Sequence, residues 1–163
     1  MSPWTADTEP VMHEDRFTEA VQAICREDPR YDIEAYFFIR EALDFTGRSL
    51  GKPSRGEGRH VSGEELLDGI RRYALQEYGP MTLTVLDSWG IRRTEDLGEL
   101  VFNLVDRGIL GSTEEDKKED FAAGYDFQEA FVEPFLPREE PPSSSRSNQG
   151  RRSRRPPPKA SDR

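Results

Sequence analysis

Hydrophobic residues recur every three or four positions along most of this chain, which is the spacing of one face of an α-helix. The first such run starts at Asp15 and ends at the Asp28-Pro29 pair, because a residue before proline is held out of the helical conformation. The second run begins after Asp32, a residue typical of a helix N-cap, and ends before Gly47. We therefore expect two helices in the first third of the chain.

Further helices are predicted by their start and stop signals. Ser62 followed by Glu65 forms a capping box, and Gly79 ends the helix that this box begins. The short segment after Gly79 is apolar almost all round, so we expect it to lie in the core. Thr94 is the expected N-cap of the next helix, which Gly108 closes.

Two glycines, Gly69 and Gly98, fall inside these predicted helices. Each costs about 1 kcal/mol relative to alanine in a helix interior, so each needs a compensating reason. We interpret both as positions where neighbouring elements approach the helix backbone closely.

The residues after Gly108 suggest a short β-hairpin, followed by a last short helix capped by Asp126. Three helices and a hairpin in this order are typical of a winged helix-turn-helix. The third of these helices carries four acidic side chains against one arginine, which is the reverse of a helix that binds DNA. The predicted fold is therefore mostly α and compatible with a winged-helix-like arrangement, and we expect it to meet protein rather than DNA.

Composition divides the chain into three parts. Residues 1–14 lack periodicity and are expected to be flexible, whereas residues 15–136 form the predicted helical domain, with a flexible loop at 51–61. Residues 137–163 are rich in proline, serine and arginine and contain no aliphatic or aromatic side chain larger than alanine. Such a segment cannot offset the entropy of ordering, so we expect a disordered basic tail.

The net charge of −9 conceals two regions of opposite sign. From Arg138 onward there are 8 basic and 3 acidic side chains, whereas the preceding 137 residues hold 15 basic and 29 acidic ones, a balance of −14. The helical part should repel nucleic acids and anionic membranes, and the tail should attract both.

The single cysteine excludes an internal disulfide and favours a reducing compartment. The N-terminal stretch has no basic start followed by an apolar run, and no segment approaches the roughly 20 apolar residues of a membrane span. We expect a soluble, cytoplasmic protein with no membrane partner.

Three segments together resemble a known bacterial family. They are Glu27-Asp28-Pro29-Arg30-Tyr31 with the helix that follows it, Tyr78-Gly79-Pro80-Met81, and Asp120-Phe121-Ala122 with Gly124-Tyr125-Asp126-Phe127. The resemblance covers about residues 15–136, and the family is restricted to Verrucomicrobia and Planctomycetes and has no known function. It implies a cytoplasmic single domain and carries over no catalytic residue, ligand or partner.

No pattern of residues indicates an enzyme. Cys25 lies on the apolar side of its predicted helix, where a thiol is usually a small core side chain. The two histidines, His13 and His60, fall in the flexible N-terminus and at the edge of the loop, and no Ser, Cys or His spacing suggests a catalytic triad. We therefore predict no catalytic residues and no cofactor.

Two weaker interpretations stay open. The acidic run between Glu114 and Asp126 has the ligand type of a hard cation site but not the spacing of an EF-hand, so a solvated acidic loop is the stronger interpretation and no metal site is predicted. The loop from Gly51 to His60 combines glycines with basic residues and is compatible with phosphate binding. It lacks the Gly-Lys-Ser/Thr ending of a P-loop, so a plain linker is favoured.

The strongest candidates for partner binding are an aromatic run and the basic tail. Phe121, Tyr125, Phe127 and Phe131, with Phe135 beyond them, either close the core or form an anchor patch for another protein. The basic residues of the tail suit phosphate backbones of RNA or DNA; they are Arg151, Arg152, Arg154, Arg155 and Lys159. Our leading hypothesis is a non-enzymatic protein-interaction or adaptor domain, and the alternative is a nucleic-acid- or ribosome-associated factor anchored by the tail.

Overall fold

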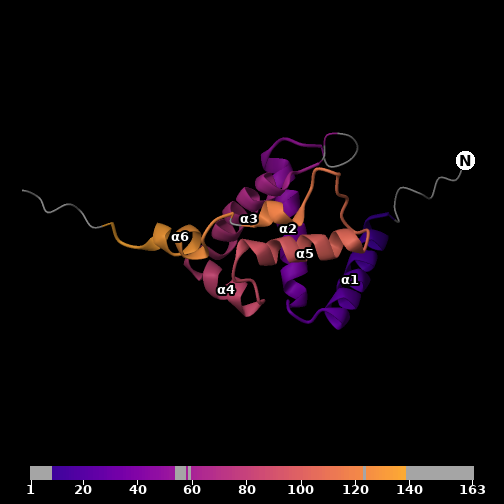
Figure 1. Ribbon diagram of the computed structural model, residues 1–163, viewed down its shortest axis with the longest axis horizontal. Coiled ribbons are helices and arrows are strands. Elements are labelled where there is room, and N and C mark those ends of the chain that lie inside the picture. Colours follow the sequence, from indigo (N-terminus) through magenta and orange to yellow (C-terminus); the bar gives the residue numbers. More distant parts are fainter. Residues whose placement is uncertain (1–8, 54–57, 59, 123, 139–163) are drawn as a thin grey trace, which may run out of the picture.

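The computed structural model describes residues 9–53, 58, 60–122 and 124–138, except for the side chains of residues 9–14. This part of the chain is mostly helical, and α5 crosses α2 near the middle of the molecule (Figure 1). Short 3-10 turns precede α4 and flank α6. The elements are α1 (Glu9–Glu27), α2 (Ile33–Ser49), α3 (Gly63–Tyr78), η1 (Gly79–Met81), α4 (Thr82–Ser88), α5 (Thr94–Asp106), η2 (Lys118–Phe121), α6 (Phe127–Phe131) and η3 (Glu133–Phe135).

Three of the predicted helix starts are confirmed by their capping hydrogen bonds. The Asp32 carboxylate accepts the N–H of Glu34 at 2.9 Å, and the Asp126 carboxylate accepts two N–H groups at the start of α6. Ser62 and Glu65 form the full capping box, because each side chain accepts the backbone N–H of the other residue. Side-chain oxygens thus satisfy N–H groups that a helix terminus leaves without partners.

Two helix starts differ from the sequence prediction. α1 begins at Glu9, six residues before the expected start. In α5 the cap position belongs to Arg93, and Asp96 supplies the cap by accepting the N–H groups of Arg92 and Arg93. Thr94 is buried and its hydroxyl accepts the N–H of Gly124, so tertiary structure uses the oxygen that we assigned to local capping.

The segment after Gly79 is only partly in the core. Thr82 and Leu86 are fully buried, but Met81 is 57% exposed and the other apolar side chains of α4 are half-buried. The segment is too short to be enclosed on all sides. The prediction that it lies in the core is therefore correct only for part of its side chains.

The expected β-hairpin after Gly108 is absent, since no strand occurs in the described residues. Residues 109–117 instead form an irregular loop that we call the arch. Its polar sequence has no alternating apolar positions, and its turn is held by a side chain: Asp116 accepts the N–H and the hydroxyl of Thr113. The winged-helix arrangement is therefore not supported, whereas the mostly α fold is confirmed.

The core lies around α2, which packs against α3 on one side and α5 on the other. Its fully buried side chains come from all three helices and include Tyr36, Ile39, Ile70, Leu97, Leu100 and Leu104. Among the described residues, no helix is both long enough and apolar enough to cross a membrane.

The two helix-interior glycines sit where neighbouring elements touch, as we interpreted them. A Cβ at Gly69 would lie 1.7 Å from the Thr46 hydroxyl oxygen, and Thr46 is itself buried. A Cβ at Gly98 would lie 2.8 Å from the Cβ of Phe121, which η2 places over α5. Both glycines thus allow close packing that a side chain would prevent.

Candidate binding cleft

A cleft of about 770 Å³ opens between the C-terminal halves of α2 and α5 and the arch. Phe17 of α1 and Leu66 of α3 complete its wall. The volume falls in the range of roughly 300–1,000 Å³ that is typical of ligand-binding pockets. The cleft is therefore the main candidate for a functional site in the described part of the chain.

Apolar side chains form the floor of the cleft. Several of them are only half-buried and so present apolar surface to solvent inside a concavity: Leu43, Val61, Phe102, Val105, Ile109 and Leu110. Single apolar residues are common on protein surfaces and need no explanation. Several apolar residues gathered in one concavity indicate a binding site.

Hydrogen bonds hold the arch in place beside this floor. Gly108, with a φ of 70°, ends α5, and the N–H groups of Ile109 and Leu110 both donate to the Leu104 carbonyl. Near its end, Asp116 lies 3.2 Å from the His60 Nε2 atom, which links the arch to the residues before α3. These contacts thus attach the arch to α5 at one end and to the residues before α3 near the other.

The carboxylates on the rim already have partners. Asp44 pairs with Arg48 at 3.2 Å on the exposed face of α2, and Asp120 accepts the N–H of Lys117 at 2.9 Å. Burial raises the pKa of Asp116, but hydrogen bonds from Thr113 and the nearby His60 outweigh it and hold the pKa below its usual range. Asp116 and Asp120 therefore serve as acceptors for their own loop, and Asp44 serves as the partner of Arg48 on α2.

The acidic run does not assemble into a cation site in the described residues. Asp116, Asp120 and Asp126 each bind backbone N–H groups of their own turns, and no cluster of three or more His, Cys, Asp or Glu side chains suited to a metal is found in the described residues.

Arg40, a cation on the rim of the cleft, differs from these acids in its contacts. The Arg40 guanidinium lies 4.5 Å from the ring centre of Phe17 and 5.5 Å from that of Phe37, and it has no carboxylate partner among the described residues. Lys52, another cation that lines the cleft, already has partners. Its ammonium group donates to Glu65 at 2.8 Å and to the His60 carbonyl. Arg40 therefore retains hydrogen-bonding capacity toward the cleft.

The backbone of the arch also has unused polar groups. Gly111 and Ser112 line the cleft, and neither forms a hydrogen bond with another described residue. A ligand with main-chain amides can bind such groups, whereas a hydrocarbon chain would leave them without partners.

The aromatic residues that we assigned to partner binding are mostly in the core. Phe121, Phe127 and Phe131 are buried, with at most 5% of their surface exposed, so they cannot form an exposed anchor patch. Tyr125 is half-buried, and its hydroxyl donates to the Leu67 carbonyl at 3.0 Å. The rings pack on one another to hold α6 against the body, which is the core alternative stated above.

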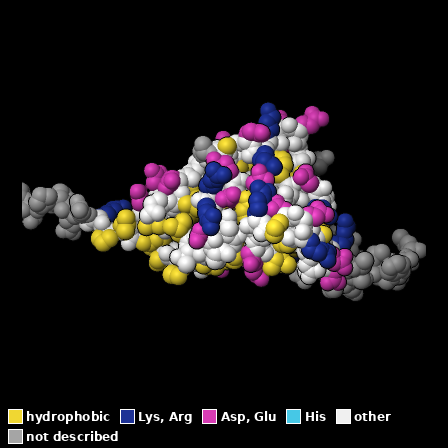
Figure 2. Space-filling model, turned by 60° about the horizontal axis from the view of Figure 1, so that its bottom comes forward, with side chains coloured by type: hydrophobic (Ala, Val, Ile, Leu, Met, Phe, Trp, Pro, Cys, Tyr) yellow, Lys and Arg dark blue, Asp and Glu magenta, His cyan; other side chains and the backbone are white. Residues whose placement is uncertain are grey.

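The exposed member of that run is Phe135. It is 46% exposed, and the neighbouring Leu136 is 55% exposed. Figure 2 shows hydrophobic side chains gathered at this end of the molecule, where η3 leads into the C-terminal segment. This end is a second exposed apolar surface, and it lies outside the cleft.

The remaining candidates are distributed as follows. The tail residues Arg151, Arg152, Arg154, Arg155 and Lys159 and the side chain of His13 lie outside the described residues. The loop considered for phosphate binding is described only in part; of its residues, Lys52 and His60 line the cleft.

The thiol of Cys25 is half-buried and outside the cleft. Burial, assisted by the negative charges of Asp32 and Asp28, raises its pKa. Its nearest hydrogen-bonding partner is the Tyr31 carbonyl, 4.0 Å from the sulfur. The environment thus disfavours the thiolate that a nucleophilic cysteine requires.

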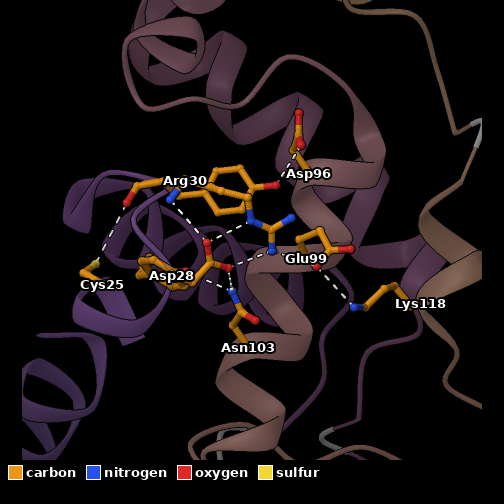
Figure 3. A network of polar contacts seen from close by, with 9 residues as sticks. Cys25, Asp28, Arg30, Asp96, Glu99, Asn103 and Lys118 are labelled. Carbon is orange, nitrogen blue, oxygen red and sulfur yellow. Dashed lines mark hydrogen bonds and ion pairs between the residues drawn. The ribbon is translucent and has the colours of Figure 1, made fainter. Parts of the chain in front are cut away.

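A separate polar network joins the turn between α1 and α2 to α5 (Figure 3). Arg30 donates two hydrogen bonds to Asp28, at 2.8 and 2.7 Å, and it also reaches Glu99 at 3.2 Å. Lys118 approaches Glu99 from the other side, and Asn103 donates to Asp28. Mainly because of the hydrogen bond from Arg30, the pKa of Asp28 falls to about 2.

No protein-family model, curated protein or solved structure matches this chain. The resemblance to the Verrucomicrobia and Planctomycetes family therefore stays a prediction from the sequence, and the candidate site rests on its own geometry.

Proposed function

We propose that this chain is a non-enzymatic protein-interaction domain whose partner binds in the cleft between α2, α5 and the arch. The observation that carries this proposal is the combination of a half-exposed apolar floor with an arginine that has no carboxylate partner among the described residues. Protein contacts commonly combine apolar anchors with arginine in this way.

The protonation states support binding rather than catalysis. The thiol of Cys25 has a raised pKa, and Asp116, at the cleft, has a lowered one. The first change disfavours a nucleophile, and the second disfavours a carboxylic acid that could donate a proton near neutral pH. A cytoplasmic location stays a prediction from the sequence.

Site-specific crosslinking tests the proposal directly. A photoreactive amino acid replaces Leu110 in the cleft of the full-length chain, and a matched control carries it at the exposed Met81. We expect a partner protein in native lysate to crosslink to position 110. This crosslink should be lost when Gly47→Phe fills the cleft. Gly47 lines the cleft, and a Cβ added there would have no heavy atom within 4 Å, so a side chain can be introduced at this position without a clash at its Cβ. Crosslinks from position 81 alone would place the partner elsewhere.

The alternative function is RNA or DNA binding through the tail, which is favoured by the excess of 8 basic over 3 acidic side chains from Arg138 onward. Replacing Arg151, Arg152, Arg154, Arg155 and Lys159 by glutamine in the full-length chain separates the two functions. Partners that depend on the cleft should survive this change and nuclease treatment. Partners that depend on nucleic acid should be lost with both and should weaken as salt rises.

A further inference from the structure

We propose that the cleft selects apolar peptide segments that carry a carboxylate, and that Arg40 is the residue that recognises this group. This inference rests on the proposed function, since it specifies the chemistry of the partner segment at the same site.

The charges around the cleft point to an anionic ligand. Among the described residues that line it, five side chains are basic (Arg16, Arg40, Arg48, Lys52 and Lys117) and three are acidic. This excess of positive charge lies on a chain whose first 137 residues hold 29 acidic and only 15 basic side chains. The cleft is therefore a cationic region on an acidic body, and an acidic segment is attracted to it and repelled by its surroundings.

The geometry of Arg40 singles it out among these cations. Its guanidinium packs against Phe17 and Phe37, and Phe17 also lines the cleft. Ring contacts hold the side chain near one position, so less rotational freedom is lost when a ligand binds. The planar guanidinium can then donate two parallel N–H groups to a carboxylate, which is the geometry that makes such pairs strong.

The other polar groups of the cleft favour a peptide over a fatty acid. Gly111 and Ser112 have no hydrogen bonds to described residues and face a ligand from the arch. An extended main chain offers amide donors and acceptors to them, whereas an alkyl chain would bury them without compensation. The floor residues Leu110 and Val105 then receive the apolar side chains of the segment.

Selection from random octapeptides tests the inference on the immobilised full-length protein. One library displays free C-termini and the other free N-termini with blocked C-terminal carboxylates, so the two libraries distinguish a terminal carboxylate from an Asp or Glu side chain. On the wild-type chain we expect enrichment of apolar residues next to a carboxylate in at least one library, and depletion of Lys and Arg.

Variants of Arg40 locate the recognition. On Arg40→Gln the preference for a carboxylate should vanish while the apolar preference remains, and a selected synthetic peptide should bind at least tenfold more weakly, a loss of about 1.4 kcal/mol. Replacing the carboxylate of that peptide by an amide should cause a similar loss on the wild-type chain and almost none on Arg40→Gln. Arg40→Lys should restore part of the affinity. Arg92→Gln, at an exposed arginine outside the cleft, should bind like the wild type.

The outcomes distinguish this inference from the proposed function. Suppose that apolar peptides bind without a carboxylate preference and that Gly47→Phe abolishes this binding. That result would overturn the inference and leave the protein-interaction function standing. A carboxylate preference that persists in Arg40→Gln would also overturn it. If Gly47→Phe binds the selected peptides as well as the wild type does, both proposals fail, because the binding site is then not the cleft.

Discussion

Two arginines of this protein lie in opposite settings. The Arg30 guanidinium donates to Asp28 through two nitrogens and reaches Glu99, so two carboxylates bind it (Figure 3). Arg40 packs on two aromatic rings at the rim of the cleft and meets no carboxylate within the described ranges. Both side chains belong to the region around α1 and α2, yet within the described part of the chain only Arg30 has carboxylate partners.

This difference separates a charged side chain that stabilises the fold through ion pairs from one that can bind a ligand. The network around Arg30 lowers the pKa of Asp28 to about 2 and ties α5 to the turn before α2. In the cleft, by contrast, Asp116 and Asp120 accept N–H groups of their own loop, and Arg40 has no carboxylate partner among the described residues. We therefore expect changes in the first region to alter stability and changes in the second to alter binding.

The largest effect should come from disrupting the core on which both regions rest. In Gly69→Ala the new methyl group would overlap Thr46, whose buried hydroxyl donates to the Ala42 carbonyl at 2.6 Å. We expect the free energy of unfolding to fall by about 3 kcal/mol or more. Denaturant unfolding followed by circular dichroism measures this loss.

The matched control is Gly47→Ala, at a helical position where an added Cβ meets nothing within 4 Å. It should leave stability unchanged or raise it by up to about 1 kcal/mol. A similar loss in both variants would show that the contact between Gly69 and Thr46 is not the cause.

The next effect concerns the Asp28 network alone. The side chain of Asp28 is 24% exposed, and Asp28→Asn should lower the free energy of unfolding by about 1–2 kcal/mol at pH 7. The folded-state pKa of about 2 lies below the ordinary value of 3.8, so the contribution of Asp28 is complete above pH 4 and is lost as the pH falls toward 2. The gap between variant and wild type should therefore close in acid.

Unfolding curves at pH 7, 5, 3 and 2 measure this dependence. Asp44→Asn is the control, because Asp44 and Arg48 are both about two-thirds exposed and such pairs contribute less than about 0.5 kcal/mol. An Asp28→Asn gap that is equally large at pH 7 and pH 2 would contradict an electrostatic origin.

Changing each of the two arginines in turn gives the sharpest form of the comparison. Arg30→Gln should lower stability by about 1 kcal/mol and leave the affinity for a selected acidic peptide within twofold of the wild type. Arg40→Gln should do the reverse, with little change in stability and a tenfold loss of affinity. Thermal melts and fluorescence anisotropy, measured on the same preparations, would contradict the division if both variants lost both properties.

The smallest effect is expected at the exposed rim. Arg48→Gln removes a cation whose only described ion pair, with Asp44, is exposed to solvent. We expect no measurable change in stability and a loss of peptide affinity of about twofold, visible at 50 mM salt and absent at 500 mM. Isothermal titration at both salt concentrations checks this result.

The sequence predicted the helices better than the site. Capping residues such as Ser62, Glu65 and Asp32 bind backbone groups two or three positions away, so their role can be predicted from the sequence alone. Thr94 misled the same reasoning because its hydroxyl binds Gly124, thirty positions later in the chain. Local rules fail where a side chain has a distant partner.

The cleft could not be predicted, because its residues come from α1, α2, α3, α5 and the arch. Two local signals existed: the basic residues of the loop from Gly51 to His60, of which Lys52 lines the cleft, and the three-residue spacing of Phe37 and Arg40, which places both side chains on one face of a helix. The aromatic run misled the assignment of a partner surface because spacing shows which residues share a face, not whether that face is covered. In the structure the run is covered up to Phe131, and Phe135 is its exposed end.

The arch is attached at both ends, in addition to the contact between Asp116 and His60. At one end, Ile109 and Leu110 donate to the last turn of α5, and at the other the ring of Phe121 occupies the space that Gly98 leaves. We therefore expect the number of residues between these two anchors to affect the width of the cleft. Because doubling the length of a flexible loop costs only about 0.6 kcal/mol, insertions and deletions here would change which segments fit without disturbing the core. We therefore expect the helical framework to tolerate changes in the length of the arch, and with them changes in the size of the cleft.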